Sequence, residues 1–79
     1  MKENKLYTKE ELEALEAWFM AAKLPKEIQL DKATYIPNVA ETVKRLLIQA
    51  KINIDNPKMQ GCLLILQRLR EKLESLSVA

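Results

Sequence analysis

The side chains that most often carry out chemistry in proteins are scarce in this sequence. It contains no histidine, so the commonest general base and metal ligand is missing. Its one cysteine, Cys62, has no second thiol for a disulfide and no evident activating base, and it fits a small core residue. A single glycine excludes the Gly-rich loops that bind phosphates. The sequence therefore predicts a protein that is not an enzyme and that uses no cofactor, metal or small-molecule substrate.

The charged residues are explained most simply by helix stability and solubility. Glutamates in the segment EELEALE, residues 10–16, lie near a predicted helix start, where negative charge stabilises the helix dipole. The second half of the chain carries six cations that could form a basic surface: Lys44, Arg45, Lys51, Arg68, Arg70 and Lys72. The net charge is only +2, which is modest for phosphate binding. A small nucleic-acid-associated regulatory protein is therefore the alternative function, and a solvated face is the simpler interpretation.

Length and composition favour one compact domain in a reducing compartment. The 79 residues are nearly half apolar and 30% charged, which is normal for a globular domain. We expect one helical domain over residues 1–79, with residues 1–7 as a flexible N-terminal arm. The N-terminus lacks the apolar run of a signal peptide, and no apolar run approaches the ~20 residues that cross a bilayer. These features predict a cytoplasmic protein without a membrane partner.

Apolar residues recur three and four apart in three segments, which predicts three helices. Their expected ranges are residues 9–22, 39–51 and 57–76. Thr8 and Glu11 can form a capping box at the first start, Asn38 can cap the second helix, and Pro57 suits the first position of the third. On the last helix the apolar seam comprises Met59, Cys62, Leu66, Leu69, Leu73 and Leu76. The predicted core comprises Leu12, Leu15, Trp18, Phe19, Val43, Leu46, Leu47, Cys62, Leu66, Leu69 and Leu73.

Residues 24–37, between the first two helices, are harder to assign. Ile28 and Leu30 alternate with polar residues, which fits either a short strand or an irregular connector. Because a lone two-stranded ribbon is weak, we expect an extended connector that places Ile28, Leu30 and Ile36 on the helices. The predicted fold class is all-α: a small three-helix bundle with a long extended connector between helix 1 and helix 2.

Each predicted helix carries one large apolar residue away from its apolar stripe, namely Met20, Ile48 and Leu64. Single exposed apolar residues are common, and the connector could cover one of them. Alternatively, Leu64 and Ile48 belong to an exposed patch for self-association or for a partner helix. These three residues are therefore the candidate partner or dimer surface. The sequence favours a non-enzymatic protein–protein interaction or assembly module that uses an exposed apolar helical surface, with a homodimer as one form of it.

Four segments in this order resemble a family of short stand-alone bacterial proteins of unknown function. They are LEAWFMAAKLP, IQLDKATYI, NVAETVKRLL and LQRLREKLE, and the likeness spans roughly residues 11–74. In that family an aromatic first helix leads into Leu-Pro and an Ile-x-Leu segment, followed by a capped second helix and a Leu-rich last helix. Asn38 stands where the family has a capping Asp, and both residues cap helices well. The resemblance implies a small all-helical domain and carries over no activity or site residue.

Overall fold

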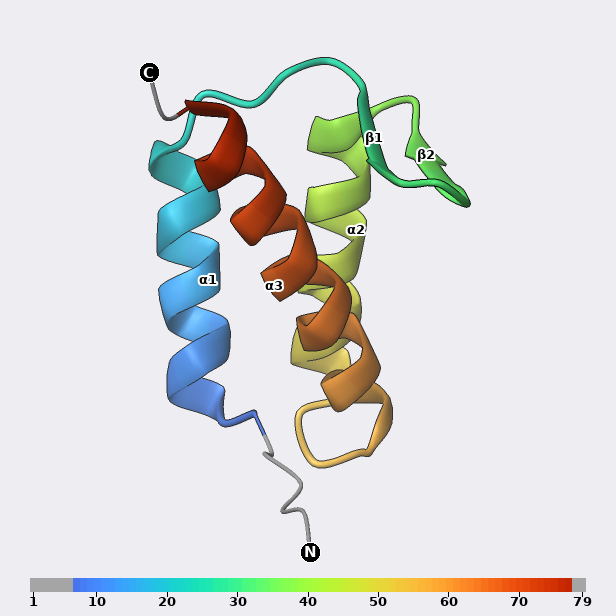
Figure 1. Cartoon of the computed structure of the whole chain (residues 1–79). Coiled ribbons are helices and arrows are strands. Elements are labelled where there is room, and N and C mark those ends of the chain that lie inside the picture. Colours follow the sequence, from blue (N-terminus) through green and yellow to red (C-terminus); the bar gives the residue numbers. More distant parts are fainter. Residues whose placement is uncertain (1–6, 78–79) are drawn as a thin grey trace, which may run out of the picture.

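The computed structural model describes residues 7–77, which form three helices and two strands. The elements are α1 (Lys9–Ala21), β1 (Ile28–Asp31), β2 (Thr34–Ile36), α2 (Val39–Ile52) and α3 (Lys58–Ser77). Figure 1 shows α3 in front of α1 and α2, with the two strands at one end of α2. The predicted helix ranges agree with these bounds to within one residue at each end. The expected N-terminal arm lies outside the described residues except for Tyr7, whose backbone N–H donates to Gln60 Oε1 at 2.7 Å.

The predicted all-α fold class is wrong, because the expected connector contains an antiparallel β-hairpin. The register pairs Ile28 with Ile36, Gln29 with Tyr35 and Asp31 with Thr34. It shifts between the last two pairs, so one strand bulges there. At the turn, Asp31 Oδ1 accepts a hydrogen bond from the Ala33 N–H at 2.9 Å. The fold is therefore mixed, with three helices and a two-stranded sheet.

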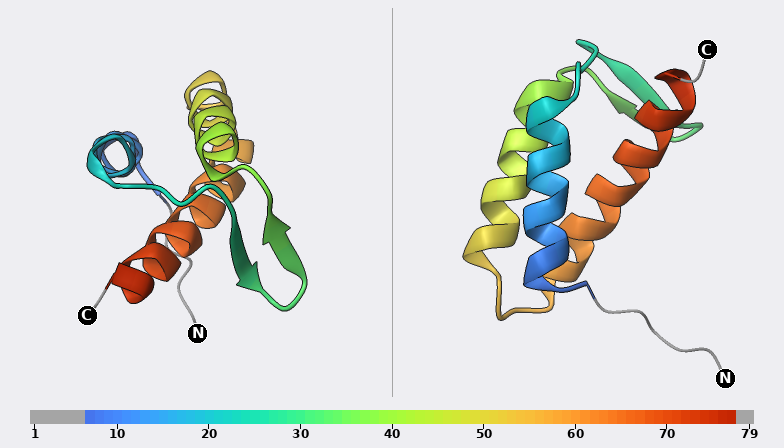
Figure 2. Two further views of the ribbon diagram at one scale, coloured as in Figure 1. Left: turned by 90° about the horizontal axis from the view of Figure 1, so that it is seen from above. Right: turned by 90° about the vertical axis from the view of Figure 1, so that its left-hand side faces the viewer.

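The hairpin is supported by the helices rather than by further strands. Ile28 and Ile36 lie opposite each other, and both side chains are only 6% exposed because they pack into the helical core. The Val39 N–H donates to the Lys26 carbonyl at 2.9 Å, which ties the chain before β1 to the start of α2. Figure 2 shows the hairpin on the side of α2 and α3 that faces away from α1. Contacts distant in sequence thus supply the stability that an isolated ribbon lacks.

The predicted helix caps are confirmed at the first two helices. The Thr8 hydroxyl accepts from the Glu11 N–H at 3.2 Å, and the Glu11 carboxylate accepts from the Thr8 N–H at 2.9 Å. This reciprocal pair is a capping box. Asn38 Oδ1 accepts from the Glu41 N–H at 3.2 Å. Both helices therefore begin where a local side chain satisfies backbone donors that the helix itself leaves free.

The core lies between the three helices and one face of the hairpin. Eight predicted core residues are buried: Leu12, Leu15, Phe19, Val43, Leu47, Leu66, Leu69 and Leu73. Trp18, Leu46 and Cys62 pack against this core but are only partly buried, so the predicted core list contained three residues too many. Residues outside the predicted list also fill the core: Ile28, Ile36, Val39, Ala50, Met59 and Leu63. On α3 it is Leu63, and not Cys62, that points into the centre.

Candidate interaction surface

The three residues predicted to form a partner surface are all exposed, but they lie on three different helices. Met20 on α1 is 78% exposed, Ile48 on α2 is 50% exposed and Leu64 on α3 is 48% exposed. Each lies away from the buried stripe of its own helix. The outward sides of three helices around one core point in different directions. All three residues are therefore accessible, and they come from three different helices.

Leu64 has other neighbours on the outward side of α3. Ile65 beside it is 41% exposed, and Gly61 and Arg68 complete a row at spacings of three and four residues. We call Gly61, Leu64, Ile65 and Arg68 the α3 face. In Figure 1 no other helix or strand is drawn over the outward side of α3. Sequence reasoning missed Ile65 as a surface residue, although its spacing from Gly61 and Arg68 was a usable signal.

Gly61, the fourth residue of α3, is not required by the packing of the described residues. A Cβ added there would meet no atom within 4 Å, and its φ is not positive. Glycine inside a helix costs up to about 1 kcal/mol relative to alanine. That cost has no compensating contact in the described fold. The exposed backbone at Gly61 does permit another helix to approach closely, because no side chain intervenes.

Arg68 borders the α3 face and links it to the hairpin. Its Nη2 atom lies 2.8 Å from Asp31 Oδ2 in β1. The ion pair directs the guanidinium towards the hairpin, while the apolar stem of the side chain remains along α3. Because both groups are partly exposed, the pair orients the two elements more than it stabilises them.

The carboxyl of Asp31 should titrate below its ordinary value. The hydrogen bond from the Ala33 N–H lowers the pKa of Asp31 below 3.8, and the Arg68 charge adds to this effect. A lowered folded-state pKa stabilises the fold above pH 3.8, and this contribution is lost as the pH falls through the folded-state value. We expect an NMR titration to give an Asp31 midpoint under 3.8, which Arg68→Gln raises only slightly. A midpoint at or above 3.8 would contradict this account.

Three of the six cations predicted as a nucleic-acid surface form ion pairs within residues 7–77. The ion pairs join Lys51 to Glu16 at 2.6 Å, Arg68 to Asp31 at 2.8 Å and Arg70 to Glu74 at 3.4 Å. Arg70 also lies over the Trp18 ring, 5.3 Å from its centroid. These contacts reduce the positive charge available to phosphates, so they weaken the support for nucleic-acid binding.

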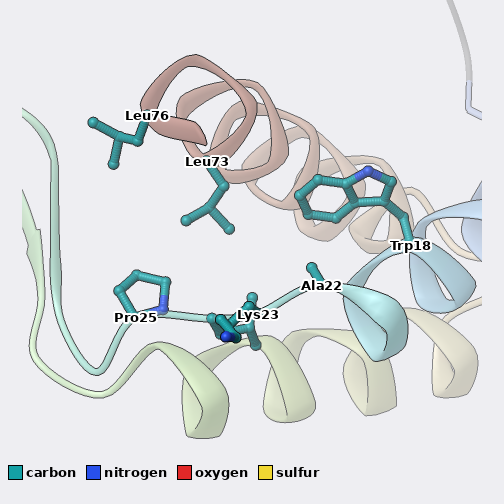
Figure 3. A pocket seen from close by; sticks show the side chains of 7 residues that line it. Trp18, Ala22, Lys23, Pro25, Leu73 and Leu76 are labelled. Carbon is teal, nitrogen blue, oxygen red and sulfur yellow. The ribbon is translucent and has the colours of Figure 1, made fainter. Parts of the chain in front are cut away.

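An open apolar groove of about 570 Å³ lies between the C-terminal ends of α1 and α3. Its lining comprises Trp18, Ala22, Lys23, Leu24, Pro25, Leu73 and Leu76. Figure 3 shows the side chains of Trp18 and Leu73 projecting into the space between the two elements. Sequence reasoning missed this groove, because its walls come from segments about fifty residues apart. Leu76, the last residue of the predicted apolar seam, is exposed here.

Within residues 7–77, no three histidine, cysteine or acidic side chains are grouped closely enough to hold a metal ion. No helix in the same part of the chain is long and apolar enough to cross a membrane. The Cys62 thiol is free and partly buried.

One of three comparisons with known proteins agrees with the resemblance to a family of unknown function. No curated protein and no solved structure is significantly similar to this chain. One family model matches residues 10–75, which is most of the chain, and is described as a domain of unknown function. The expectation of a family of unknown function is thus confirmed over nearly the same residues. The chain belongs to the DUF6965 family, a domain of unknown function.

Proposed function

We propose that this protein is a protein–protein interaction or assembly module that binds through the α3 face. One observation carries the proposal: Leu64 and Ile65 are exposed side by side next to Gly61. Burial of apolar surface stabilises a complex by about 25 cal/mol for each Å² removed from water. Exposed apolar side chains on one helix can anchor a partner helix. In this proposal the module acts by binding and performs no catalysis.

A second exposed apolar pair on α2 provides a comparison. Ile48 and Ile52 are four residues apart, and both are at least half exposed. No glycine accompanies them, and scattered apolar residues are normal on protein surfaces. The α3 face differs because the glycine opens the backbone beside its two apolar side chains. We therefore assign binding to α3 and use Ile52 as the matched control.

The proposed setting is the cytoplasm, because a single partly buried thiol suits a reducing compartment. Self-association and a different protein partner are both compatible with the α3 face. A nucleic-acid role has less support, since three of its six predicted cations are paired within the chain.

Site-specific crosslinking in the native cells tests the proposed function. We expect a photoreactive aromatic residue at position 64 to give a discrete protein adduct, at least about tenfold stronger than the same residue at position 52. Ile65→Glu in the same chain should remove the adduct, because burying a charge in an apolar contact is costly. Circular dichroism should show unchanged helix content in each variant. Equal adducts from positions 64 and 52, or none from position 64, would overturn the proposal.

A further inference from the structure

We draw no further inference here: the strongest candidate, the open apolar groove between the C-terminal ends of α1 and α3, carries none because nothing in the structure shows what covers it, since Lys23 in its lining favours an anionic ligand whereas the two helix C-termini favour a cationic one.

Discussion

Leu63→Ala is expected to lower the free energy of unfolding by about 3–5 kcal/mol, while Leu64→Ala lowers it by less than about 0.5 kcal/mol. The two leucines are adjacent, but Leu63 is 0% exposed and Leu64 is 48% exposed. Truncation at Leu63 loses the transfer free energy of the side chain and leaves a cavity among packed helices. A domain of this size has a stability of only about 5 kcal/mol. The Leu63→Ala protein should therefore retain at most about 2 kcal/mol, so that from a few per cent to about half of it is unfolded at room temperature.

Urea denaturation followed by circular dichroism at 222 nm measures both free energies. Leucine and alanine have similar helix propensities, so the comparison isolates packing. The protein is held at about 1 µM, so that any weak self-association does not contribute. Equal losses for the two variants would show that α3 is rotated differently about its axis.

Leu63 and Leu64 also show why the sequence alone does not determine which side of α3 is buried. Apolar residues occupy positions 62–66 without interruption, so a helical period fits more than one rotation of the stripe. The seam through Cys62 was preferred, whereas the fold buries Leu63 and exposes Ile65. Contacts with α1 and α2 decide between these rotations, and no local pattern encodes them. The caps at Thr8 and Asn38 could be predicted because their partners lie three residues away.

The candidate surface could be predicted only in part for a related reason. The exposure of Leu64 follows from its place among polar residues on one helix. Whether Met20 and Ile48 lie beside it depends on how the three helices are arranged, which no single helix encodes. The groove at Trp18 and Leu73 brings together chain segments far apart in sequence, so no single segment carried its signal. Tertiary packing thus decides which exposed side chains become neighbours.

Ile36→Ala is expected to lower the free energy of unfolding by about 2–4 kcal/mol. Ile36 is buried opposite Ile28, and both belong to the core that the helices form. Residues 24–37 were predicted to be an extended connector because a two-stranded ribbon is weak alone. In this fold the ribbon is held by its buried isoleucines, so their loss should weaken the whole domain. Urea unfolding followed by circular dichroism at 222 nm, which reports helix content, measures this effect.

Unfolding of the helices is the informative measurement, because it distinguishes between two roles for the hairpin. If β1 and β2 are part of one cooperative unit, Ile36→Ala should shift the urea midpoint of the helices. If the hairpin is only an appendage, the helices should unfold as in wild type while the strand amides lose protection from exchange. Tyr35→Ala provides the control, since its half-exposed side chain contacts Glu27 on the surface, and we expect a loss under about 1 kcal/mol. A helical midpoint unchanged by Ile36→Ala would show that the hairpin does not support the bundle.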